Sequence, residues 1–283
     1  MSKEVLNNKN GVARPAGKFK AHLSVLELYL RSSVYKTSTA IAVMALTEAG
    51  LFCWRGIRQP SFDEAVAESW LVLPFVAAFL AIAVICMNSG AAKTQSIVTY
   101  TFRRLQISEK SAYIWHFVCG VICLLLLWAG QAAVFYGLSR LWASAARDLP
   151  AEAAVYGPQG IYLAFFRNDF LHSVIPLQDP GKLVGNAAQI FACAAACSYL
   201  QIKTRQPEGE RRAFAPIMVF ASAPTMFRTT FGNGDVIIFS VFTAVLGAYC
   251  LIAGYNLADD GRTHTEPEEY RPVIKPGKEA RDA

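Results

Sequence analysis

The longest apolar run of the chain, Tyr113 to Leu138, predicts a helix that crosses a lipid bilayer. It holds 26 residues, and only His116 and Gln131 interrupt it with strongly polar side chains. A helix needs about 20 consecutive apolar residues to span a membrane. A soluble helix of this length would keep a polar face toward water, and no face of this run is polar throughout. We therefore expect an all-α integral membrane protein.

Further apolar segments predict a polytopic bundle of about six transmembrane helices. The first is short and carries Glu48, and the fifth carries Pro216 and Pro224, which remove helix hydrogen bonds and bend the helix. The spans are expected within one transmembrane domain over residues 18–258, near residues 38–54, 70–87, 113–138, 183–202, 213–229 and 236–254.

Composition and charge agree with a membrane location. Hydrophobic residues make up 54% of the chain and charged residues 17%, against about 25% charged in ordinary soluble domains. If both termini are cytoplasmic, 20 of the 27 Lys and Arg residues lie on the inner side. This is the bias that the positive-inside rule requires. We therefore expect a multi-pass protein of the plasma membrane with both termini in the cytoplasm.

The segments that flank the spans differ in character. Residues 1–17 are polar and basic, and residues 259–283 are charged and rich in proline, so both are expected to be disordered. Between them and the first span, residues 18–33 repeat apolar side chains at helical spacing: Phe19, Leu23, Leu26 and Leu30. This spacing predicts an amphipathic helix, which either lies in the cytoplasmic membrane interface or packs on a neighbouring protein.

Motifs for catalysis and cofactor binding are missing from the sequence. The two Gly-Lys pairs, at residues 181–182 and 277–278, lack the earlier glycine of a phosphate-binding loop. Two cysteine pairs, Cys119 with Cys123 and Cys193 with Cys197, share a helix face, but no histidine or carboxylate joins them, so helix packing is favoured over metal binding. We expect no enzyme, no directly bound cofactor, no metal and no nucleic-acid partner.

The loop from residue 91 to 112 is the most informative short stretch. Four apolar residues can share one side of a short helix over residues 96–105, with Arg103 and Arg104 beside them: Ile97, Val98, Phe102 and Leu105. Ser108 then follows, and its hydroxyl can cap the next helix by accepting a bond from an unpaired backbone N–H. A short helix joined to a membrane-crossing one in this way can transmit force.

This loop resembles the coupling-helix region of type-2 ABC-transporter permeases. The resemblance rests on the pattern Thr-x-x-x-Leu, a spacer, Ile-Ser and a charged pair, formed here by Thr101, Leu105, Ile107, Ser108, Glu109 and Lys110. Gln106 stands where proline is common in that family. The family also has six spans, cytoplasmic termini and an amphipathic helix ahead of the first span.

The resemblance implies a permease subunit of an ATP-driven exporter. Such subunits form a homodimer or a heterodimer, and a separate cytoplasmic ABC ATPase subunit binds the ATP. The residues that the resemblance assigns to ATPase coupling are Ile97, Val98, Thr101, Phe102, Arg103, Arg104, Leu105, Ser108 and Glu109. A non-transporting integral membrane scaffold or regulatory protein is the alternative hypothesis.

The segment over residues 160–176 has apolar residues on both sides of Arg167, Asn168 and Asp169, with His172 one turn later. A charged side chain at the centre of a membrane helix costs about 2.5–3.5 kcal/mol on insertion scales, so an interfacial or re-entrant helix on the outer side is expected. Arg167, Asp169 and His172 are possible members of a translocation path. Alternatively, Arg167 and Asp169 pair with each other or face lipid headgroups.

Glu48 is the one carboxylate well inside an expected span, and it completes the possible path. Ionisable groups within a membrane usually face protein or a water-filled cavity. Glu48 could bind substrate or join two helices. A shift of the first span could also bring it to the outer interface near Trp54, six residues or about 9 Å further along the helix.

Overall fold

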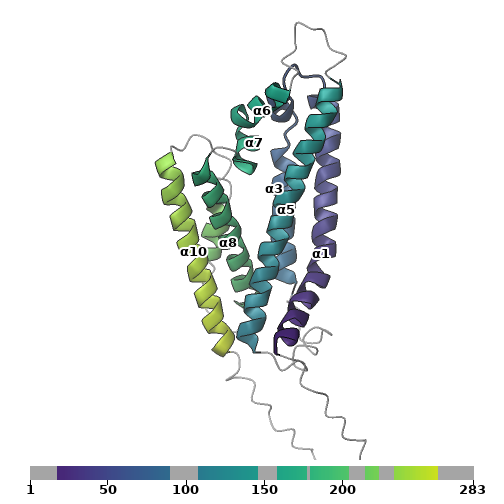
Figure 1. Ribbon diagram of the computed structural model, residues 1–283. Coiled ribbons are helices and arrows are strands. Elements are labelled where there is room, and N and C mark those ends of the chain that lie inside the picture. The colour runs from purple at the N-terminus through teal and green to yellow at the C-terminus, as the bar shows by residue number, and fades with distance from the viewer. Residues whose placement is uncertain are drawn as a thin grey trace, which may run out of the picture.

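The computed structural model describes residues 18–89, 108–145, 158–176, 179–203, 214–222 and 233–260. These residues form helices and no strand (Figure 1). Four helical stretches are long and apolar enough to cross a membrane: Leu23–Gly56, Glu109–Ala145, Pro180–Lys203 and Ile237–Ala258. A bent helix pair, Phe62–Glu68 with Val72–Asn88, makes a fifth if it counts as one span. The expected all-α bundle is thus present, with four or five of the six expected spans.

The first helix, α1 (Lys18–Leu51), is continuous over 34 residues. It joins the expected interfacial helix over residues 18–33 to the expected first span, so the interfacial helix is not a separate element. The physical reason is that no glycine or proline lies between Lys18 and Gly50. Polar residues fit into α1 because hydroxyls of Thr39 and Thr47 donate to carbonyls four residues earlier.

A π-helical turn, η1 (Phe52–Gly56), ends α1 and leads to α2 (Phe62–Glu68) and α3 (Val72–Asn88). Trp70 links α2 to α3 with a left-handed φ of 54°, a conformation that is rare for a bulky residue. The two helices meet at an angle of 59°. A Cβ added to Gly56 would lie 2.7 Å from the carbonyl oxygen of Ala65, so glycine permits the close approach of α2 to η1.

The helix α5 (Glu109–Ala145) is 37 residues long and extends beyond the expected span at both ends. At 1.5 Å per residue its length is about 55 Å. It packs against α1, α3, α8 and α10. One side of α5 is buried inside the bundle, and it includes Cys119, Cys123, Leu127, Phe135 and Trp142.

The expected outer segment forms two short helices, α6 (Pro158–Arg167) and α7 (Asp169–Val174). Phe170 packs edge-on against Phe75 and Phe135, with ring centroids 5.8 and 5.3 Å away. The indole N–H of Trp128 donates to the carbonyl oxygen of Val174 at 2.9 Å. The side-chain amide of Asn186, in the second turn of α8, donates to the carbonyl of Ser173 at 2.7 Å. The end of α7 therefore enters the bundle instead of lying over it.

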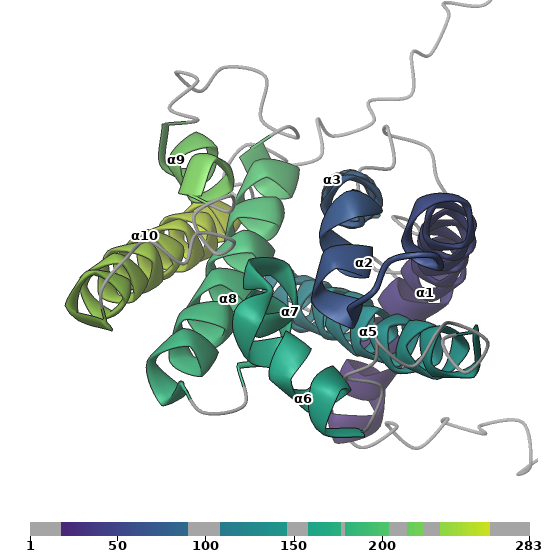
Figure 2. The same cartoon turned by 90° about the horizontal axis from the view of Figure 1, so that it is seen from above.

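The helix α8 (Pro180–Lys203) lies between two groups of helices. Figure 2 shows α1, α3 and α5 on one side of it, and α9 (Phe214–Ser222) and α10 (Asn233–Asp260) on the other. Six consecutive small residues, from Ala192 to Cys197, are buried there. A Cβ added to Gly247 of α10 would lie 2.7 Å from the Cα of Ala192. Small residues thus allow the helix backbones to pack closely, as is common between membrane helices.

The start of α1, the start of α5 and the end of α10 lie at one end of the bundle, which we call the lower end (Figure 1). A hydrogen bond of 3.2 Å from the Tyr113 hydroxyl to the Cys250 carbonyl joins α5 to α10 near this end. The opposite, upper end carries α2, α6 and α7. The described α9 has nine residues, and the rest of the expected span 213–229 lies outside the described residues, as do residues 1–17 and most of the expected tail.

Candidate functional site

The upper end of the bundle is organised around Asn168, where α6 ends and α7 begins. Its Oδ1 atom accepts hydrogen bonds from the backbone N–H groups of Phe170 and Leu171, at 3.0 and 3.1 Å. This is an N-cap, which satisfies donors that a helix leaves unpaired. Its Nδ2 atom donates to the carbonyl oxygen of Asp63 at 3.0 Å. One side chain therefore starts α7 and fixes it to α2.

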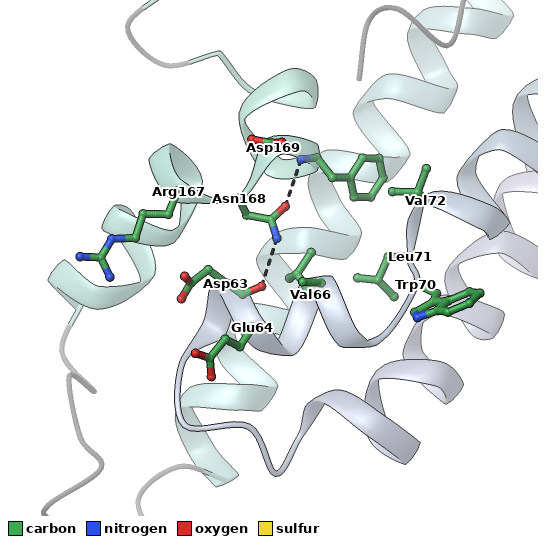
Figure 3. Close-up of a pocket in the computed structure, with 11 residues that line it drawn as sticks. Asp63, Glu64, Val66, Trp70, Leu71, Val72, Arg167, Asn168 and Asp169 are labelled. Carbon is green, nitrogen blue, oxygen red and sulfur yellow. Dashed lines mark hydrogen bonds between the residues drawn. The ribbon is translucent and has the colours of Figure 1, made fainter. Parts of the chain in front are cut away.

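A pocket of about 410 Å³ lies beside Asn168, between α2, the start of α3 and the α6–α7 break (Figure 3). Its apolar lining includes Val66, Leu71 and Phe170. Charged residues stand at its edge: Asp63, Glu64, Arg167 and Asp169. The structure thus brings two of the expected path residues, Arg167 and Asp169, to one pocket. They form no ion pair with each other, and Figure 3 shows Arg167 extending away from the apolar lining.

His172 does not line this pocket, although it follows Asp169 by one helical turn. Its ring lies 6.2 Å from that of Phe166, between centroids. Its Nδ1 atom is buried and has no hydrogen-bond partner among the described residues. Burial, and next the charge of Lys182, hold the pKa of His172 below its ordinary value. The neutral imidazole is therefore favoured.

Glu48 lies away from the pocket, in the interface between α1 and α5. Its side chain is fully buried, and its Oε2 atom accepts a hydrogen bond of 2.8 Å from Nε2 of Gln131. Of the three alternatives for Glu48, this bond supports a contact between helices. Gln131 was not expected to take part in a site, although it is one of two strongly polar residues in the longest apolar run.

His116, the other polar residue of that run, forms a second buried junction. Its Nδ1 atom is 2.9 Å from the hydroxyl of Ser198 on α8. Its Nε2 atom is 3.0 Å from both the carbonyl of Cys86 and the hydroxyl of Ser89, at the end of α3. The ring of Tyr29 on α1 packs edge-on at 5.2 Å. His116 on α5 therefore joins α1, α3, α5 and α8 near the lower end.

The residues assigned to ATPase coupling lie mostly outside the described residues, since the structure describes none between positions 90 and 107. Ser108 and Glu109 are described. The hydroxyl of Ser108 accepts from the backbone N–H of Ser111 at 3.2 Å, so Ser108 caps α5 as its sequence position predicts. Glu109 is exposed in the first turn, where a negative charge is favourable.

Within the described ranges, no group of three or more His, Cys, Asp or Glu residues is placed to hold a metal ion. The six buried cysteines are free thiols, and Cys53 is an exposed one.

The described residues define an all-helical fold whose apolar helices are compatible with a membrane. Comparison with family models gives no match, and comparisons with curated proteins and with solved structures give no significant match either.

Proposed function

We propose that this chain is the membrane-spanning permease subunit of an ATP-driven exporter, worked by a separate cytoplasmic ATPase. The observation that carries the proposal is the position of α5. This helix begins at the Ser108 cap, directly after the loop that resembles a coupling region, and runs the full length of the bundle. A helix joined to the loop in this way is suited to carry a movement across the membrane.

The contacts of α5 support the same role. It packs against α1, α3, α8 and α10, and two of these contacts sit close to its start: the His116 junction and the Tyr113–Cys250 hydrogen bond. Because packed interfaces change between discrete arrangements, a displacement of the first turns of α5 would be passed to both helix groups.

The proposal includes six crossings, made by α1, the bent pair α2–α3, α5, α8, the segment 213–229 and α10. It places the protein in the plasma membrane. The lower end and both termini are then in the cytoplasm, because this orientation puts 20 of the 27 basic residues on the inner side. It also includes a second permease subunit, identical or related, as the family resemblance implies.

The test is co-purification with an ABC ATPase encoded beside this chain. Changing Arg103, Arg104 and Leu105 together to Asp should abolish the association, because it reverses two charges and removes an apolar contact. A matched control changes Arg55 and Arg58 to Asp at the opposite end of the bundle and should leave the association intact. Undisturbed binding by the triple variant would refute the role of the loop.

A non-transporting membrane scaffold is the second candidate. The observation that favours it is the place of the described pocket, which lies at the upper end and is not a path between the long helices. A scaffold would bind its partner without changing it. If the purified chain in vesicles stimulates ATP hydrolysis by the ATPase subunit, the permease is favoured. If the hydrolysis rate of the ATPase subunit is unchanged, the scaffold is favoured.

A further inference from the structure

Two unpaired oxygen atoms lie between α1 and α5, in the interior of the bundle. Glu48 and Gln131 are both fully buried, and the single hydrogen bond between them uses Oε2 of Glu48 and Nε2 of Gln131. The Oε1 atom of each side chain is buried without a partner. Both of these atoms are acceptors, so the pair lacks a donor. Buried polar groups are nearly always hydrogen-bonded, and this exception requires a physical explanation.

Within the described helices that pack around this pair, no cation compensates a charge on Glu48. The helix α3, which packs on α1, carries no charged residue between Val72 and Asn88. Lys36 precedes Glu48 by twelve residues on α1, which is about 18 Å along the helix axis. Arg55, seven residues or about 10 Å further on, is exposed and stacks over Trp54 at 4.9 Å.

On α5, the nearest cation is Arg140, nine residues or about 13 Å beyond Gln131. It donates to the hydroxyl of Tyr136 at 3.1 Å. A carboxylate at Glu48 would therefore be a buried charge without a counter-ion, which is far more costly than a neutral polar group.

We propose that the carboxyl of Glu48 holds a proton and donates it to Oε1 of Gln131, so that the two residues form a proton-binding site inside the bundle. A single proton on Oε1 of Glu48 gives each unpaired oxygen a hydrogen bond and also removes the buried charge. A carboxylic acid and a primary amide are complementary in this way, since each offers one donor and one acceptor. Loss of the proton would leave a carboxylate facing an amide oxygen and would weaken the α1–α5 contact.

This site is independent of the proposed transport function, because it depends only on the described residues of α1 and α5. It places an exchangeable proton at a helix interface, so the affinity for the proton and the packing of α1 on α5 are linked. Any movement that separates α1 from α5 would release the proton, and any movement that closes the interface would take one up.

The direct test is infrared difference spectroscopy of the wild-type chain against Glu48→Gln in lipid vesicles near neutral pH. A protonated carboxyl has a carbonyl stretch at higher frequency than a carboxylate. The wild type should show such a band, absent from Glu48→Gln, and Gln131→Leu should shift it by removing its hydrogen-bond partner. If the wild type lacks the band, Glu48 is ionised and the proposal is wrong. Glu48→Met serves as the reference if Glu48→Gln does not fold.

A second measurement uses thermal unfolding in detergent over a range of pH. The amide of Glu48→Gln can form both hydrogen bonds with Gln131 at every pH. Deprotonation affects only the wild type, whose midpoint should fall relative to Glu48→Gln as the solution becomes alkaline. A constant difference between the two proteins from acid to alkaline pH would overturn the proposal, because it would mean that Glu48 does not exchange a proton.

Discussion

The contact between α8 and α10 yields the sharpest prediction, through Gly247. An added Cβ at this position would lie 2.7 Å from the Cα and 2.9 Å from the Cβ of Ala192. Real Cβ atoms do not approach other atoms so closely, and the opposing atoms belong to a backbone and an alanine, which cannot rotate away. Gly247→Ala must therefore push the two helices apart.

Two effects of opposite sign determine how much Gly247→Ala changes the free energy of unfolding. Inserting a methyl group into a packed interface costs about 1–3 kcal/mol. Replacing glycine by alanine inside a helix returns about 0.5–1 kcal/mol. A matched control separates the two effects. Gly137 on α5 has nothing within 4 Å of an added Cβ, so Gly137→Ala should show only the stabilisation that comes from replacing glycine by alanine in a helix. The two variants should therefore differ by the packing cost alone, about 1–3 kcal/mol.

The assay is the reaction of buried cysteines with a thiol-specific dye during heating in detergent. Six cysteines are buried and Cys53 is exposed, so a Cys53→Ser background reports only on unfolding. Gly247→Ala should unfold at a lower temperature than the background protein, and Gly137→Ala at the same or a higher one. Equal midpoints for the two variants would refute the close packing of α10 on α8.

Three further outcomes are expected. Ser108→Ala should destabilise the first turn of α5 by about 0.5–2 kcal/mol, measured as faster hydrogen exchange there, and unchanged exchange would contradict the cap. Asn168→Asp keeps the cap of α7 but loses the donor to Asp63, whereas Asn168→Ala loses both, so proteolysis at α7 should be fastest in the alanine variant. His172 should titrate in nuclear magnetic resonance below its ordinary pKa. Because the folded protein disfavours protonation, the stability that neutral His172 contributes is lost as pH falls below that ordinary value, and Lys182→Gln should move the pKa upward.

The apolar pattern predicted most of the helices that the structure describes. Residues 70–87, 183–202 and 236–254 correspond to α3, α8 and α10, with ends shifted by one to six residues. Two expectations were incomplete for a local reason. Residues 18–33 and 38–54 were expected as an interfacial helix followed by a span, and the structure joins them in the single helix α1. The division of residues 160–176 arises at Asn168, whose side chain competes for backbone donors and starts a new helix.

The candidate sites were less predictable. Arg167 and Asp169 are two residues apart, and the sequence singled them out, yet the pocket they border needs Asp63 and Glu64 of α2, more than 100 positions earlier. The sequence identified Glu48 as an exception because a carboxylate within an apolar span is rare in any fold. It did not identify Gln131 as its partner, since 83 positions separate them.

The sequence by itself determined that this chain folds as apolar helices and which of their residues are polar exceptions, because hydropathy and helix breakers act within a few residues of one another. Only the tertiary structure decided which exceptions meet. Glu48 reaches Gln131 and His116 reaches Ser198 because α1 and α8 both pack against α5, and that packing is the sum of many small contacts between distant segments.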